Sequence, residues 1–209
     1  MSTLLYVIAS PRGDRSKSRA LAEAFIDQWT QANPDGTVDR LDVFETDLPA
    51  FDGPAMEAKY TILHGDDPTG EQARAWSRVE EVIDRFTSAD KVVFAVPMWN
   101  FGIPYRLKQL FDVIVQPGYT FKYSPDEGYT GLVTGKPAFV ACARGGDYDE
   151  KSSASVDHQL SYMELILGFM GFTDIRSLVV QPTLMGGPEE AGQALTRQLT
   201  RAREMAGSF

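Results

Sequence analysis

The sequence is poor in the residues that build disulfide frameworks and metal sites. It contains one cysteine, Cys142, and two histidines among 209 residues. A lone cysteine excludes an internal disulfide and a zinc site built from several cysteines. The histidines, His64 and His158, are far apart in the sequence and lack the spacing of metal ligands. We therefore expect no metal site, and we expect Cys142 to be a small buried residue of an apolar strand.

Long apolar runs and an excess of basic residues are missing as well. The apolar run at residues 4–9 is too short for a signal peptide or a membrane span. The formal net charge is −9, so the chain lacks the basic surface that non-specific binding to nucleic acids or anionic membranes requires. We expect a cytoplasmic protein that binds neither nucleic acid nor membrane.

Apolar runs and helical patterns alternate along the whole chain. The predicted strands are residues 4–9, 37–41, 91–96, 137–143 and 173–180. The predicted helices are residues 18–31, 53–59, 69–87, 105–115, 157–170 and 189–206. Such alternation predicts a parallel sheet with helices on both faces. We expect a single α/β domain over residues 1–209, a three-layer sandwich whose five-stranded sheet has the order 2-1-3-4-5. The long segment 116–136 is a candidate binding loop.

In that strand order, the loops after the first, third and fourth strands converge at the switch point of the sheet. The first loop, residues 10–18, combines three serines with three cations. Hydroxyl groups, positive charge and a helix N-terminus are what a phosphate group needs. The loop has neither the P-loop nor the G-x-G-x-x-G pattern, which disfavours a nucleoside triphosphatase. The alternative is a solvated turn in which Ser16 or Ser18 only caps the helix.

The second loop, residues 97–104, lies between two prolines and contains no Ser, Cys, His, Asp or Glu. Its Met98, Trp99 and Phe101 are large apolar side chains in a position that is normally exposed to solvent. Asn100 offers both a hydrogen-bond donor and an acceptor to the edge of a heterocycle. This composition favours a flat ligand, and the alternative is an ordinary core or interface role for the aromatic residues.

The third loop, residues 143–148, contains the pair Gly145 and Gly146 followed by Tyr148. Paired glycines allow backbone conformations that direct N–H groups at a ligand, and Tyr148 could pack against it. Alone, such a pair usually marks only a turn. Three loops of this chemistry at one edge of a sheet together predict a ligand site.

With these loops in place, the chain resembles the FMN-dependent NADH azoreductases, a branch of the flavodoxin-like NAD(P)H:quinone oxidoreductases. The similarity is densest in Pro97-Met98-Trp99-Asn100-Phe101-Gly102-Ile103-Pro104, and it continues through residues 118–123, 131–136, 144–146 and 167–172. The family usually has Tyr where this chain has Trp99, and often Ser where it has Ala143. Main-chain contacts would survive both changes, whereas the hydroxyl contacts would be lost.

The resemblance implies non-covalently bound FMN, NADH or NADPH as electron donor, and a homodimer with its active sites at the interface. The residues implied at the phosphate are Ser10, Ser16, Lys17 and Ser18, with Arg12 in addition. Those implied along the flavin ring are Pro97, Met98, Trp99, Asn100, Phe101 and Gly102, and on its pyrimidine side Ala143, Arg144, Gly145 and Gly146, with Tyr148 beside them. Those implied at the substrate are Trp99, Phe101, Tyr123 and Phe169. No catalytic side chain is implied, because the flavin carries the chemistry.

The implied reaction is a two-electron reduction of quinones, and reductive cleavage of aromatic azo compounds, by a ping-pong cycle. Two other classes share this fold. A flavodoxin-type electron carrier would bind FMN without turning over a substrate, but the aromatic residues of the second loop favour an enzyme. A signalling receiver domain would need an aspartate after the third strand, where this chain has Pro97, and acidic residues after the first, where it has Ser10.

Overall fold

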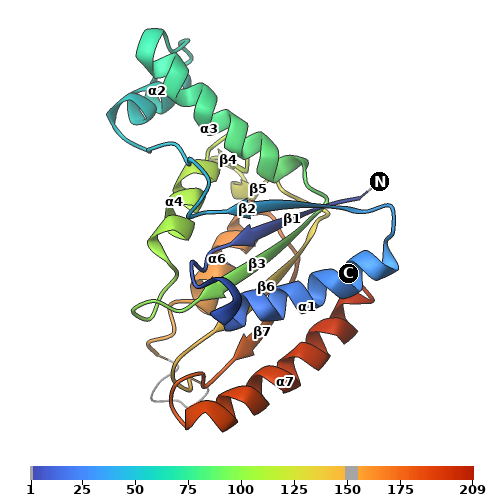
Figure 1. The fold of residues 1–209 in the computed structure, drawn as a ribbon. Coiled ribbons are helices and arrows are strands. Elements are labelled where there is room, and N and C mark those ends of the chain that lie inside the picture. The colour runs from blue at the N-terminus through green and yellow to red at the C-terminus, as the bar shows by residue number, and fades with distance from the viewer. Residues whose placement is uncertain (1, 149–154) are drawn as a thin grey trace.

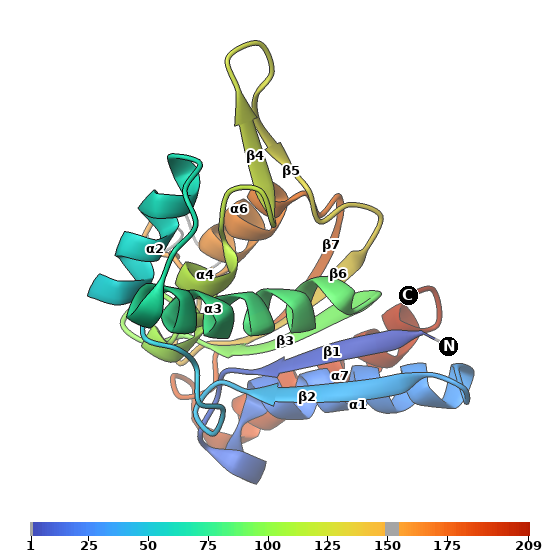
Figure 2. The ribbon, with the colours of Figure 1, turned by 90° about the horizontal axis from the view of Figure 1, so that it is seen from above.

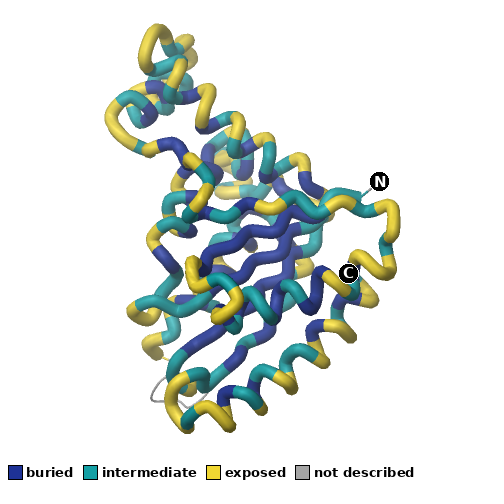
Figure 3. Tube along the Cα trace, in the orientation of Figure 1, coloured by how far each residue is buried: buried dark blue, intermediate teal, exposed yellow. Residues whose placement is uncertain are grey.

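Five strands form the central sheet because each is a short run of residues suited to burial between two layers of helices. They are β1 (Thr3–Ile8), β2 (Thr37–Asp42), β3 (Lys91–Pro97), β6 (Pro137–Ala143) and β7 (Asp174–Val180). The computed structural model, which describes residues 2–148 and 155–209, pairs all neighbouring strands in parallel (Figure 1). The inner strands are buried along most of their length, and the edge strands are less so (Figure 3).

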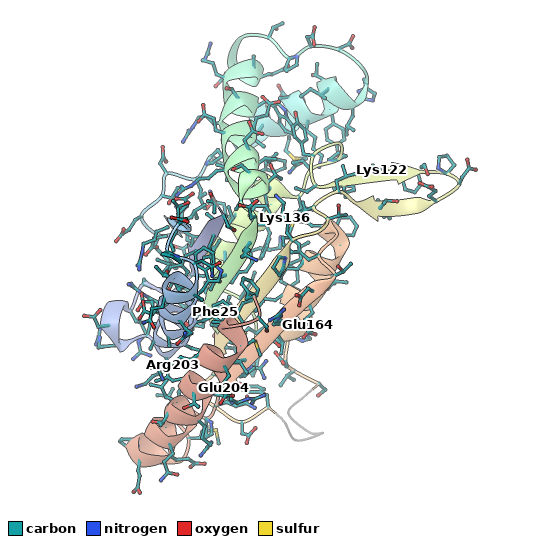
Figure 4. All side chains as sticks on the ribbon, turned by 90° about the vertical axis from the view of Figure 1, so that its right-hand side faces the viewer. Phe25, Lys122, Lys136, Glu164, Arg203 and Glu204 are labelled. Atoms are coloured by element: carbon teal, nitrogen blue, oxygen red, sulfur yellow. The ribbon has the colours of Figure 1, made fainter. Side chains whose placement is uncertain are left out.

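The order across the sheet is β2-β1-β3-β6-β7. Counted along the chain this is 2-1-3-6-7 and not the expected 2-1-3-4-5, although the five predicted strands occupy the predicted places. The numbering differs because the segment predicted as a loop contains two further strands, β4 (Phe121–Ser124) and β5 (Gly128–Gly131). They form an antiparallel hairpin that projects away from the sheet (Figure 2), and Lys122 on β4 marks it in Figure 4.

Helices cover both faces of the sheet (Figure 2). One face carries α1 (Lys17–Ala32) and α7 (Gly187–Ala206), and the other carries α3 (Gly70–Ser88), α4 (Tyr105–Ile114) and α6 (Leu160–Met170), with α2 (Gly53–Leu63) packed on α3. Successive residues of a strand point to opposite faces, so each inner strand contributes to two cores. Phe25 of α1, labelled in Figure 4, stacks on Phe139 of β6 with 4.2 Å between ring centroids. None of the helices in the described ranges is both long and apolar enough to cross a bilayer.

The capping residues explain where two helices begin. Ser16 precedes α1, and its Oγ accepts a hydrogen bond from the Arg19 N–H at 3.2 Å. Asp157 was predicted to lie inside the helix that follows β6, yet its Oδ1 accepts from the N–H groups of Gln159 and Leu160. Asp157 therefore lies before α6, which begins at Leu160 with Gln159 as its N-cap, and its carboxylate satisfies two N–H groups at the start of the helix.

Candidate functional site

The three predicted loops lie side by side because β1, β3 and β6 are neighbours that end at one edge of the sheet (left in Figure 1). The Ala9 N–H donates to the Ala95 carbonyl at 3.0 Å, and the Met98 N–H donates to the Ala143 carbonyl at 2.9 Å. Pro97 and Ala143 are direct partners in the sheet. Carboxyl ends of strands beside a switch point are where parallel sheets bind ligands.

The first loop presents buried hydroxyl groups at the N-terminus of α1. Ser10 is 1% exposed, and its Oγ has no hydrogen-bond partner among the described residues. Ser16 and Ser18 are also buried, with their Oγ atoms 3.2 Å apart. An unpaired buried hydroxyl costs roughly 1–3 kcal/mol, and the first N–H groups of a helix lack intrahelical acceptors. The loop therefore suits a ligand rich in acceptors, such as a phosphate group, even though Ser16 also caps the helix.

The cations of the first loop face solvent. Arg12 and Arg15 are exposed and Lys17 is half-buried. Within residues 2–148 and 155–209, no hydrogen bond or ion pair engages these three side chains, so they remain available to a phosphate group. Together with the helix dipole they make this the positively polarised side of the site.

The second loop turns back through two residues with left-handed backbone. Trp99 and Gly102 exchange backbone hydrogen bonds of 2.9 and 3.0 Å, and between them Asn100 and Phe101 have φ values of 47° and 70°. This is the arrangement of a type I′ turn, in which glycine usually occupies the second position. Phe101 holds that strained position with its side chain 50% exposed. Strain of this kind persists where the surroundings impose it, often at ligand sites.

Trp99 lies in an aromatic cluster that the sequence did not reveal. Its ring centroid is 5.7 Å from that of Phe44, in the segment after β2, and 6.3 Å from that of Tyr105, at the start of α4. The cluster holds the indole at the base of the turn. Trp99 is therefore partly an interface between segments, as the alternative interpretation allowed, whereas Phe101 stands out from the turn.

The third loop packs against the segment that follows β7. The Gly145 carbonyl accepts from the N–H groups of Leu184 and Met185, both at 3.0 Å. A Cβ on Gly145 would lie 3.0 Å from Leu184 Cδ1, and one on Gly146 would lie 3.2 Å from Met185 Sδ. Both positions thus favour glycine because of close packing, a reason that the sequence could not show.

The guanidinium of Arg144 is committed to the protein. Its Nε donates to Gln159 Oε1 at 2.9 Å, its Nη2 to Asp157 Oδ2 at 2.6 Å, and its Nη1 to Gln181 Oε1 at 3.3 Å. The Tyr148 ring lies 5.6 Å from its Cζ. A ligand contact at Arg144 stays a prediction for its backbone only.

Tyr123 and Phe169 lie away from the other predicted site residues within one chain. The His158 N–H donates to the Phe101 carbonyl at 2.9 Å, so the second loop meets the start of α6. Phe169 lies near the other end of that 11-residue helix, about 14 Å from Leu160 along its axis. There its ring packs with the hairpin, which presents an exposed Tyr123.

Other reactive residues take no part in the site. Burial raises the pKa of the Cys142 thiol to about 12, so this cysteine stays protonated at neutral pH. His64 and His158 are exposed. Across the described part of the chain there is no group of three His, Cys, Asp or Glu residues that could hold a metal ion.

Comparisons with known proteins agree on the fold and indicate one enzyme family. A protein family described by its flavodoxin-like fold matches residues 2–206. The FMN-dependent NADH:quinone oxidoreductase of Nitratidesulfovibrio vulgaris (strain DP4) is 51% identical over 210 residues, covering 100% of both chains. The azoreductase from Bacillus anthracis str. Sterne has a TM-score of 0.92 at 33% identity, with 100% of both chains covered.

An FMN-dependent NADH-azoreductase from Bacillus anthracis str. Ames Ancestor, solved in complex with FMN, has a TM-score of 0.87 at 26% identity. That match covers 99% of this chain and 100% of the other. The expected fold class, a flavodoxin-like α/β fold with a five-stranded parallel sheet, is confirmed.

Proposed function

The chain belongs to the family of FMN-dependent NADH:quinone oxidoreductases with a flavodoxin-like fold, and from this premise we propose that it binds FMN and reduces quinones and aromatic azo compounds. Electrons would come from NADH or NADPH. The observation that carries the proposal is the buried, unpartnered Ser10 hydroxyl beside Ser16 and Ser18 at the N-terminus of α1. A phosphate group at this place would accept the hydrogen bond for which the Ser10 hydroxyl has no partner within the described residues.

The residues of the three loops fit FMN. Ser10, Ser16 and Ser18 would hold its phosphate through their hydroxyls, with Lys17 and Arg12 adding charge. The backbone of residues 97–102 and of Ala143 to Gly146 would line the ring. Bound FMN supplies the redox chemistry, because it accepts hydride from a nicotinamide and passes two electrons to an acceptor. The protein binds and orients it, and the second loop needs no acid–base side chain because protons can come from water.

The two substrates should bind one after the other, because both would use the same face of the flavin. A nicotinamide and a flat acceptor both need the exposed face of the flavin, so the first product leaves before the acceptor enters. We therefore propose a ping-pong cycle. Initial rates measured at several NADH and quinone concentrations should give parallel double-reciprocal lines, and intersecting lines would contradict this order.

We also propose that two copies form a homodimer whose hairpins complete the substrate clefts. Tyr123 and Phe169 lie at the opposite end of α6 from Phe101, and exposed aromatic groups on a projecting hairpin favour a partner surface. Sedimentation should give a dimer. Mixing a Ser10→Ala chain with a Phe169→Ala chain should restore some activity, because one cleft of the mixed dimer would have both residues intact. A monomeric active protein would refute the arrangement.

The family match across residues 2–206 supports treating residues 1–209 as one domain. We also propose the cytoplasm as its compartment, because the cytoplasm contains the NADH and NADPH that would serve as electron donors.

The direct test is the flavin itself. Purified protein should be yellow, with absorbance near 450 nm, and protein freed of flavin should take up added FMN. It should then oxidise NADH in the presence of a benzoquinone and, separately, of an azo dye. Uptake of FMN without turnover would favour the alternative, a flavodoxin-type electron carrier. Failure to take up FMN would refute the proposal.

A further inference from the structure

One buried side chain joins the two loops that would line the flavin ring. Gln159 is 0% exposed and precedes α6. Its Oε1 accepts from Arg144 Nε at 2.9 Å, and its Nε2 donates to the Val96 carbonyl at 2.9 Å. Val96 immediately precedes the second loop, and Arg144 belongs to the third. The Gln159 carboxamide therefore links the third loop, through its oxygen, to the residue just before the second loop, through its amino group.

Asp157, two positions before Gln159, neutralises the buried charge of Arg144. Asp157 Oδ2 lies 2.6 Å from Arg144 Nη2, and the two side chains are only 16% and 3% exposed. Asp157 Oδ1 accepts from the Gln159 N–H at 3.0 Å. The aspartate thus balances Arg144 and also orients Gln159. A charged group at such burial is costly without its partner.

His158, between Asp157 and Gln159, holds the strained turn of the second loop through its backbone. The His158 N–H donates to the carbonyl of Phe101 at 2.9 Å, which is the residue with φ of 70°. Left-handed backbone at a bulky residue persists only where its surroundings fix it. Residues 157–159 consequently contact the second loop at Phe101, the residue just before it at Val96, and the third loop at Arg144.

We propose that Gln159, Asp157 and Arg144 are positioning residues, which set the spacing of the second and third loops so that the FMN site is formed before the cofactor binds. This inference rests on the proposed function and extends it to residues whose side chains are hydrogen-bonded to other parts of the protein. Preorganised loops bind more tightly because the cost of ordering them is met in folding.

The Arg144–Asp157 pair also has an electrostatic consequence. Reduced FMN carries negative charge near the pyrimidine side of its ring, and the third loop is the one expected there. Removing the Asp157 charge would leave Arg144 unbalanced next to that loop. The reduced form of the cofactor would be favoured, and the midpoint potential of bound FMN would rise. A residue that only stabilises the fold would not produce this shift.

The test compares both ends of the sheet. Gln159→Leu keeps the volume and removes both side-chain hydrogen bonds. Asp157→Asn keeps Oδ1 for the N–H groups of Gln159 and Leu160 but removes the charge and the oxygen that accepts from Arg144 Nη2. The matched control is Asp174→Asn at the amino end of β7, where Asp174 pairs with Arg176 at 2.9 Å. Each variant is examined by FMN titration, by amide hydrogen exchange of the FMN-free protein at residues 98–102 and 145–146, and by the potential of bound flavin.

We expect Gln159→Leu to raise the Kd for FMN about tenfold and to speed amide exchange in both loops. Asp157→Asn should shift the potential upward, and Asp174→Asn should change none of these quantities. Wild-type Kd and exchange in Gln159→Leu would overturn the inference. If Gln159→Leu does not fold, an unchanged or lowered potential in Asp157→Asn overturns it. Should the wild-type protein bind no FMN, the proposed function fails, while amide exchange still reports whether Gln159 holds the loops.

Discussion

The two ends of the central sheet use the same kind of ion pair in opposite ways. At the carboxyl end the side chains of Arg144 and Asp157 are 3% and 16% exposed, whereas at the amino end those of Arg176 and Asp174 are 23% and 49% exposed. Arg176 also donates to Ser208 Oγ at 2.9 Å and so fastens the end of the chain at the surface. The buried pair positions loops, and the exposed pair anchors a terminus.

The polar groups at the two ends also differ in their surroundings. At the amino end Lys136, labelled in Figure 4, donates its Nζ to the Thr87 carbonyl, and Asp90 Oδ2 accepts from the Thr3 N–H at 2.7 Å. At the carboxyl end the buried Ser10 hydroxyl has no partner among the described residues. Buried polar groups are normally paired. Trp29 Nε1, near the end of α1, also lacks a partner, but the Ser10 hydroxyl lies in a loop beyond a strand end and near a helix N-terminus, so we assign the ligand to the carboxyl end.

The largest expected effect lies at the amino end, where β5 meets the end of α6, and is an effect on stability. A Cβ on Gly131 would overlap the backbone of Met170 and Gly171, which cannot move as a side chain can. Gly131→Ala should lower the free energy of unfolding by about 3 kcal/mol, a fall in Tm of roughly 6–12 °C for a chain of this size. Thermal unfolding of the FMN-free protein measures it, and FMN affinity at temperatures where the variant is folded should stay at the wild-type value. A stable variant that has lost FMN would contradict the division between the two ends.

The next effect has opposite signs for stability and for binding. Ser10→Ala removes a buried hydroxyl without a partner, so the FMN-free protein should gain about 1 kcal/mol in its free energy of unfolding. The same change should raise the Kd for FMN about tenfold, because a donor to the phosphate is lost. Urea unfolding and FMN titration of one preparation measure both. Ser208→Ala at the other end is the control. Equal FMN binding by the wild type and Ser10→Ala would refute the proposal that the first loop binds the phosphate.

The regular elements could be predicted because burial leaves a pattern in the sequence. The predicted strand at residues 137–143 coincides with β6, and that at 91–96 falls one residue short of β3. The hairpin was not predicted, because β4 and β5 have four residues each and contain no buried residue. Such strands carry neither a continuous apolar run nor a clear alternation.

The candidate site was predicted at the level of loops and not of side-chain networks. Ser10 and the turn at Phe101 follow strands, and the strand order brings their loops together. Gln159 was not predicted as a site residue because its two side-chain partners lie 15 and 63 residues away in the sequence. A glutamine before a helix also has no distinctive sequence pattern. Arg144 beside two glycines resembled a ligand contact, and only the fold shows that its guanidinium turns inward.

A smaller effect is expected where glycine packs against a flexible side chain. A Cβ on Gly145 would lie 3.0 Å from Leu184 Cδ1, which is exposed and free to rotate. Gly145→Ala should therefore cost less than about 1 kcal/mol of stability, in contrast to Gly131→Ala. Its Kd for FMN should rise severalfold because the third loop shifts. Thermal unfolding and FMN titration check this, and Gly145→Ala in a Leu184→Ala background should recover part of the affinity.

The smallest effect concerns pH at the exposed pair. Two hydrogen bonds from Arg176, of 3.0 and 2.9 Å, hold the pKa of Asp174 below its ordinary value. The carboxylate therefore stabilises the fold fully above the unfolded-state pKa of about 3.9, and this contribution is lost as the pH falls through the lower pKa of the folded state. Because the pair is half exposed, Asp174→Asn should cost only a few tenths of a kcal/mol at pH 7. Urea unfolding at pH 7 should show that difference, and it should shrink as the pH falls below about 3.9 and in 1 M salt, where about 3 Å of screening length remains. A difference that persists in acid would mean that Asp174 acts through packing and not through its charge.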